Sequence, residues 1–254
     1  MMATGRFFKN LYKRTVQIEM VVLTGLLLLG GGIWGFLEIA DEVMEGDTHA
    51  IDTKLILAMR APDDVSDPVG PKWMEEMARD TTALGGMGFL GFVTISVCGL
   101  FLLERKPRYA LFVLVAVCGG LLLSQGFKAG FDRPRPDLVP HNSHVQTASF
   151  PSGHSTLSAV TYLTLGAMLA AVNTKRRIRL YYLFLACFIT VMVGCSRVYL
   201  GVHWPSDVVA GWSLGLSWSI LCLLALRIVS MRKKTTSASG FEREGLEKNS
   251  SETY

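Results

Sequence analysis

Six long apolar stretches dominate the sequence and restrict what it can fold into. We expect them at Met20–Ile39, Leu84–Leu103, Tyr109–Phe127, Ser155–Val172, Leu180–Cys195 and Val208–Val229. A helix of roughly 20 apolar residues crosses the hydrocarbon core of a bilayer and satisfies its own backbone groups there. Half of the residues are hydrophobic and 18% are charged, which excludes an ordinary soluble domain and a disordered chain. The sequence therefore predicts an all-α protein, a six-transmembrane helical bundle.

The distribution of charge predicts how this bundle lies in the membrane. Basic clusters precede the first span, lie between the second and third and between the fourth and fifth, and follow the sixth, whereas the loop 41–80 is acidic. By the positive-inside rule, a multi-pass protein of the cell (inner) membrane with both termini cytoplasmic is expected. The predicted organisation is a cytoplasmic segment 1–19, a six-span domain 20–230 with 41–80 as its outer loop, and a disordered cytoplasmic tail 231–254.

The charges and cysteines outside the motifs point to neither nucleic acid nor metal. The inner basic clusters lie where Lys and Arg residues set the orientation of a membrane protein and face the lipid headgroups. No nucleic-acid partner is therefore expected. All five cysteines lie inside apolar runs at no metal-ligand spacing. The sequence therefore predicts no disulfide framework and no metal site. Membrane lipid is the partner it indicates.

Three polar clusters interrupt the apolar pattern, at Lys128–Pro136, Phe150–Ser155 and Ser196–Asp207, and six spans place all of them on the outer side. Their four cations lie where the positive-inside rule disfavours positive charge, so an anionic partner such as phosphate is expected for Lys128, Arg133, Arg135 and Arg197. The alternative is that these side chains snorkel to lipid headgroups. Arg133 fits a substrate contact and a plain interfacial charge equally well.

The second cluster is expected to open a helix. Ser152, Gly153 and His154 would then present free backbone N–H groups and the positive end of the helix dipole to the same anion. Gly153 would also allow the anion to approach the backbone closely.

Two histidines have the surroundings of catalytic groups. Asp207 follows His203 by four residues and can accept a hydrogen bond from one imidazole nitrogen, which leaves the other as a nucleophile. His154 can give a proton to the departing oxygen. Together these roles indicate phosphoryl transfer through a phosphohistidine. His141 and His144 lack this context, and we expect polar caps or surface residues there.

The clusters resemble the three-part signature of the type 2 phosphatidic acid phosphatase family, also called the lipid phosphate phosphatases. Lys128 stands six residues before Arg135-Pro136, Pro151-Ser-Gly-His154 follows, and Ser196-Arg197 stands five residues before His203. The matching region, Lys128 to Asp207, is roughly a third of the chain. Arg133 lies outside the signature, doubles its Arg-Pro step and could touch a second phosphate.

The resemblance implies a haloperoxidase-like helical fold and an enzyme that works without metal or cofactor. It implies that His203 is the nucleophile, that Asp207 orients it, and that His154 is the general acid for the leaving group. The phosphate binders that it implies are Lys128, Arg135, Ser152, Gly153 and Arg197.

The sequence thus predicts a phosphatase that removes the terminal phosphate of a lipid phosphate or pyrophosphate at the outer, periplasmic face. The pattern resembles bacterial members, so undecaprenyl pyrophosphate is favoured, and phosphatidic acid and phosphatidylglycerol phosphate are also candidates. One alternative is a lipid phosphotransferase on the same scaffold. Another is a non-enzymatic membrane protein that binds lipid phosphates. A vanadate-binding haloperoxidase shares the family's site, but the membrane spans argue against it.

Overall fold

The computed structural model describes residues 2–138 and 148–251, and the side chains of residues 19–138 and 148–230. Its elements are α1 (Met2–Glu45), α2 (His49–Leu57), α3 (Lys72–Ala83), α4 (Met87–Leu103), α5 (Pro107–Gly130), α6 (Gly153–Ser158), the π-helical turn η1 (Ala159–Leu163), α7 (Thr164–Val172), α8 (Arg176–Tyr199) and α9 (Pro205–Ser251). In the described part of the chain the only β pairing is one isolated bridge, which confirms the all-α prediction. His141 and His144 lie outside the described residues.

Among the residues that the structure describes, five helical segments are long and apolar enough to cross a membrane. The span predicted as the fourth corresponds to the continuous run of α6, η1 and α7. Helix α4 has only 17 residues, fewer than the roughly 20 that a span requires. It can cross together with α3 as a sixth span broken by a 46° bend. The predicted multi-span helical bundle is confirmed.

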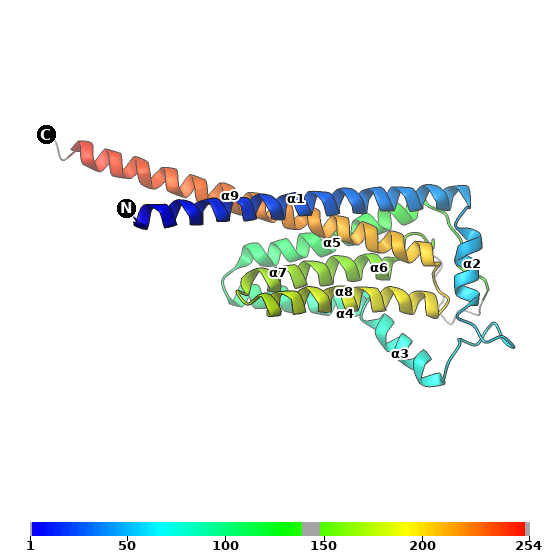
Figure 1. Ribbon diagram of the computed structural model, residues 1–254. Coiled ribbons are helices and arrows are strands. Elements are labelled where there is room, and N and C mark those ends of the chain that lie inside the picture. Colours follow the sequence, from blue (N-terminus) through cyan, green and yellow to red (C-terminus); the bar gives the residue numbers. More distant parts are fainter. Residues whose placement is uncertain (1, 139–147, 252–254) are drawn as a thin grey trace.

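The two ends of the bundle differ. Helices α1 and α9 pack along each other, and the start of α1 and the end of α9 lie at the same end of the bundle (Figure 1). Helices α2 and α3 lie at the opposite end (Figure 1). Ile56 of α2 packs there with Val198, Trp204 and Val208, which seats α2 on the connection between α8 and α9.

The first and last helices are longer than the sequence predicts. Helix α1 begins at Met2, so the expected segment 1–19 is the start of the same helix. Helix α9 continues to Ser251, through most of the stretch expected to be a disordered tail, and it projects beyond the other helices (Figure 1). No proline follows Pro205, and the Lys, Arg, Glu and Leu residues of this stretch are good helix formers.

Close packing of α6 on α9 brings the second and third polar clusters together. A Cβ added at Gly211 would lie 2.8 Å from the carbonyl oxygen of Ser152, and one added at Gly215 would lie 2.6 Å from that of Thr156. Small residues allow membrane helices to approach closely in this way. The two glycines, four residues apart on α9, therefore let the start of α6 lie directly against it.

Replacement of Gly215 by alanine is expected to lower both stability and activity. The atoms that would meet the new Cβ are the carbonyl oxygen of Thr156 and the Cβ of Ala159. Neither can rotate away, and such overpacking costs about 1–3 kcal/mol. Thermal unfolding of the purified protein in detergent measures the change. Gly30→Ala is the matched control, because a Cβ at this helical glycine would meet nothing within 4 Å. Equal stability of the two variants would contradict the prediction.

Candidate active site

A short loop between α8 and α9 presents His203 to the site. Pro205 opens α9, where its fixed φ suits the first helical position, and Asp207 lies in the first turn. Oδ2 of Asp207 accepts a hydrogen bond from the N–H of Trp204 at 3.0 Å, which satisfies a donor that a helix start leaves unpaired. The same oxygen lies 3.3 Å from Nδ1 of His203. The four-residue spacing thus becomes a contact between two buried side chains.

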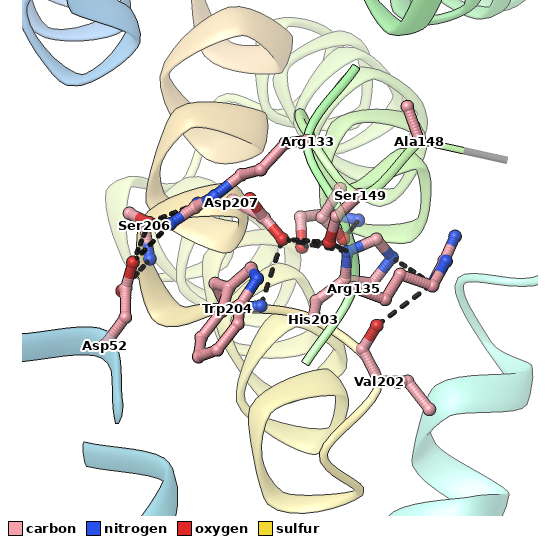
Figure 2. A network of polar contacts seen from close by, with 12 residues as sticks. Asp52, Arg133, Arg135, Ala148, Ser149, Val202, His203, Trp204, Ser206 and Asp207 are labelled. Atoms are coloured by element: carbon pink, nitrogen blue, oxygen red, sulfur yellow. Dashed lines mark hydrogen bonds and ion pairs between the residues drawn. The ribbon is translucent and has the colours of Figure 1, made fainter. Parts of the chain in front are cut away.

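Ser149 completes the surroundings of Nδ1. Its hydroxyl donates to Oδ2 of Asp207, and its Oγ lies 3.3 Å from Nδ1 of His203. Both neighbours can accept, so Nδ1 is the nitrogen that carries hydrogen, and Nε2 is left unprotonated as an acceptor. On the other side of the ring, Nη1 of Arg135 lies 3.3 Å from Nε2 and donates to the carbonyl oxygen of Val202 at 2.9 Å (Figure 2).

The imidazole of His203 is neutral near pH 7. Burial lowers its pKa to about 4, the hydrogen bond and charge of Asp207 oppose this shift only in part, and Arg197 and Arg135 lower the pKa further. A neutral ring with an unprotonated Nε2 is the form that can attack phosphorus.

Three of the predicted phosphate-binding cations meet beside the histidines. Lys128 lies in the last turn of α5, Arg135 in the segment that follows, and Arg197 in the last turn of α8. They interact electrostatically with one another and with His154. Three cations from different segments so close together repel one another, and a bound anion would relieve this repulsion. We call Lys128, Arg135 and Arg197 the cation cluster.

Protein contacts hold two members of this cluster in place. Lys128 donates to the carbonyl oxygen of Ala148 at 2.7 Å, and Nη1 of Arg197 donates to Oγ1 of Thr82, on α3, at 3.1 Å. Nε of Arg197 is buried without a hydrogen-bond partner among the described residues. A buried donor of this kind costs free energy until an acceptor satisfies it. A phosphate oxygen would be such an acceptor.

The start of α6 lies against the cation cluster. A Cβ added at Gly153 would lie 3.6 Å from Cε of Lys128. Ser152 caps the helix, with its Oγ accepting from the N–H of Ser155 at 3.4 Å. The N–H of Ser152 donates to the carbonyl oxygen of Asp207 at 3.0 Å, so it is not free as the sequence suggested. The hydroxyl hydrogen of Ser152 and the N–H groups of Gly153 and His154 remain the candidates for binding an anion.

Arg133 points away from the cation cluster, contrary to the prediction that it touches substrate. Its guanidinium lies 5.5 Å from the centre of the Trp204 ring. Figure 2 shows it on the side of Asp207 opposite Arg135. The reason is that protein oxygens occupy both terminal nitrogens: Asp207 Oδ1 at 2.6 Å, Ser206 Oγ at 2.7 Å, Asp52 Oδ2 at 2.7 Å and Thr48 Oγ1 at 3.1 Å.

Five polar residues of the site were missed at the level of sequence: Thr48, Asp52, Thr82, Ser149 and Ser206. Ser149 stands next to the second cluster, and its proximity was the available signal. Asp52 shares a buried helical face with Ile56, four residues on. Within the described residues, no group of three or more His, Cys, Asp or Glu side chains is placed to hold a metal ion.

Comparison with known proteins agrees with the motifs. The model of the PAP2 superfamily matches residues 109–230. Phosphatidylglycerophosphatase B of Bacillus subtilis is 37% identical over 148 residues, which are 57% of this chain and 71% of that protein. Lipid A 1-phosphatase of Rhizobium etli is 37% identical over 120 residues, and undecaprenyl-diphosphatase of Sulfolobus acidocaldarius is 31% identical over 148 residues. These matches cover 44% and 55% of this chain, and 47% and 65% of those two proteins.

A solved structure shares the fold. The crystal structure of a transmembrane PAP2-type phosphatidylglycerolphosphate phosphatase from Bacillus subtilis superposes with a TM-score of 0.64 and 28% identity, over 81% of this chain and 96% of that one. Sequence motifs, relatives and helical architecture therefore agree, and the chain belongs to the PAP2 superfamily as one of its membrane phosphatases.

Proposed function

We propose that this phosphatase hydrolyses the terminal phosphate of a lipid phosphate or lipid pyrophosphate through a phosphohistidine intermediate. The placement of His203 carries the proposal. Asp207 and Ser149 engage Nδ1, while Nε2 faces Arg135 and the cation cluster. A phosphate that takes over the Nη1 donor of Arg135 would lie against the unprotonated Nε2 of the imidazole.

The reaction that we propose has two steps. In the first, Nε2 of His203 attacks phosphorus, the bond from phosphorus to the lipid oxygen breaks, and His154 gives that oxygen a proton. In the second, water attacks the phosphohistidine, His154 takes a proton from the water, and inorganic phosphate leaves. The cation cluster stabilises the charge on the transferring group. Asp207 stabilises the positive charge that the ring of His203 acquires when it binds phosphorus.

His154 must be protonated for the first step. It interacts with the three cations of the cluster and with His203, and these cations oppose its protonated form. A phosphate dianion bound among them neutralises most of their charge and favours the imidazolium. The proposed general acid is therefore prepared by the substrate itself.

Membrane orientation supports a site at the outer leaflet. The catalytic loop and α2 lie at the end of the bundle opposite the start of α1 and the end of α9 (Figure 1). The basic clusters of the sequence belong to that other end. By the positive-inside rule we place both termini in the cytoplasm and the site at the periplasmic face of the cell membrane.

We propose undecaprenyl pyrophosphate as the first substrate to test, followed by phosphatidylglycerol phosphate and phosphatidic acid. The similar proteins are named for phosphatidylglycerophosphate, lipid A and undecaprenyl diphosphate. What these substrates share is a phosphate on a lipid, which is the group that the cation cluster suits. A panel of these lipids assayed on one preparation ranks them by kcat/KM.

A labelling experiment tests the intermediate. The purified full chain in detergent with EDTA is mixed with lipid phosphate carrying a labelled terminal phosphate and is quenched rapidly. We expect acid-labile, alkali-stable label on the protein, which then appears as inorganic phosphate. Transfer of the label to a lipid acceptor would instead identify the phosphotransferase. Rapid phosphate release with no label on the protein at any time would contradict the phosphohistidine. Loss of activity in EDTA would contradict a metal-independent reaction.

A further inference from the structure

Asp207 has a second side that the proposed reaction does not use. While Oδ2 faces His203, Oδ1 accepts a hydrogen bond from Nη1 of Arg133 at 2.6 Å. Nη2 of the same guanidinium donates to Oδ2 of Asp52 at 2.7 Å. Figure 2 shows the resulting chain of contacts, from Asp52 through Arg133 and Asp207 to His203.

Asp52 lies on α2, in the outer segment of the chain, and its side chain is fully buried. Its Oδ1 accepts from the backbone N–H of Ser206 at 2.9 Å, and its Oδ2 accepts from Oγ of Ser206 at 2.5 Å. Ser206 immediately precedes Asp207 in the first turn of α9. Asp52 therefore holds both the arginine that binds Asp207 and the backbone next to Asp207.

The charges in this chain depend on one another. Arg133 lies between two fully buried carboxylates and shares one positive charge between them. If Asp52 lost its charge, Asp207 would be the one carboxylate among the described residues that still pairs with the guanidinium. Asp207 would then have less negative charge available to orient and stabilise the ring of His203. The guanidinium of Arg133 also lies over the Trp204 ring, 5.5 Å from its centre, and this cation–π contact helps to hold it between both partners.

We propose that Asp52 is a positioning residue for phosphoryl transfer, acting through Arg133 and Ser206 to hold Asp207 in the geometry that orients His203. The outer helix α2 is then part of the catalytic apparatus. The inference rests on the proposed function, because it requires His203 to be the nucleophile. Among the described residues, the side-chain hydrogen bonds of Asp52 go to Arg133 and Ser206, and none goes to the cation cluster. Its loss should therefore affect the reaction more than the binding of phosphate.

Asp52→Asn tests the proposal, because asparagine keeps the shape of the side chain and removes its charge. We expect kcat for a lipid phosphate to fall about 10- to 100-fold, the range that small misplacement of a reacting group produces. KM and competitive inhibition by inorganic phosphate should stay close to those of the parent protein. Asp63→Asn is the matched control, since Asp63 is an exposed acid in the same outer segment. It should leave kcat unchanged.

Making the same change in an Arg133→Met protein tests whether Asp52 positions Asp207 or merely stabilises the fold. If Asp52 acts through Arg133, Asp52→Asn should change kcat little in an Arg133→Met protein, because the effects of residues in one chain of contacts do not add. Ser206→Ala removes a single hydroxyl from the same chain and should lower kcat in the same direction with a smaller effect. This milder variant decides the matter if Asp52→Asn shows no cooperative thermal unfolding in detergent.

Three results would overturn the proposal: an unchanged kcat in Asp52→Asn, a raised KM with unchanged kcat, or fully additive losses in the double variant. An unchanged kcat in Ser206→Ala would overturn it where Asp52→Asn does not fold. Failure of the proposed function has a different signature, because it would appear as full activity of a His203→Ala protein whatever Asp52→Asn does.

Discussion

Replacement of His203 by alanine is expected to lower phosphate release from a lipid phosphate by at least about 10⁴-fold, as removal of a catalytic nucleophile does elsewhere. The buried ring has its Nδ1 beside Asp207 and Ser149 and its Nε2 beside Arg135, and no other described nitrogen has this combination of neighbours. The loss should appear in kcat measured in detergent with EDTA. The cation cluster remains in the variant, so protection of the protein by inorganic phosphate against thermal unfolding should persist.

Two controls accompany this variant. His144→Ala changes a histidine that the motifs leave out, and it should keep parental activity. Asp207→Asn keeps the nucleophile but weakens its orientation, so its kcat should lie between those of the parent and His203→Ala. Near-parental phosphate release by a folded His203→Ala protein would remove His203 from the mechanism.

The contact between His203 and Asp207 could be predicted from sequence because local rules place these two residues. Asp207 follows His203 by four residues across a helix start that Pro205 marks, and such a carboxylate bonds back to the N–H groups before the helix. The N-cap of α6 is likewise marked by Ser152. Helix ends were less predictable, since hydropathy records the thickness of the hydrocarbon and not where a helix stops. Helices α1 and α9 therefore extend well past the apolar stretches.

The direction of the two neighbouring arginines could not be predicted. Arg133 and Arg135 have the same residue type, each precedes a proline, and Pro134 and Pro136 exclude a helix there. The structure has no regular helix or strand from Phe131 to Asp137. No periodicity could therefore show that one guanidinium would face the histidines and the other Asp52.

The role of Asp52 was hidden for another reason. It is one of eleven acidic residues between positions 41 and 80, and its partner Ser206 lies 154 residues away along the chain. Only tertiary packing buries Asp52, because Ile56 on the same face of α2 packs against Trp204 and Val208. Composition identified the loop as acidic, but it could not distinguish the one buried carboxylate.

The effect of replacing His154 should depend on the leaving group. An alkoxide leaves poorly without a proton, so His154→Ala should lower kcat for phosphatidic acid by about 10²–10⁴-fold, the usual contribution of a general acid. Loss should be smaller for a lipid pyrophosphate, whose leaving group is itself a phosphate, and smallest for p-nitrophenyl phosphate, whose phenolate leaves unprotonated. In the second step His154 also takes a proton from water, so the variant should hydrolyse the phosphohistidine slowly. With the labelled aryl substrate, phosphohistidine should therefore accumulate on the variant.

His203→Ala separates this effect from a general loss of catalysis. It removes the acceptor of the phosphoryl group, so it should impair all three substrates alike, whereas His154→Ala should rank them by the stability of the departing anion. The comparison is informative because both histidines lie next to the same cations, and a mere disturbance of phosphate binding would affect every substrate through KM. Equal losses of kcat for alkyl, diphosphate and aryl substrates in His154→Ala would mean that His154 holds the phosphate and does not protonate the leaving oxygen.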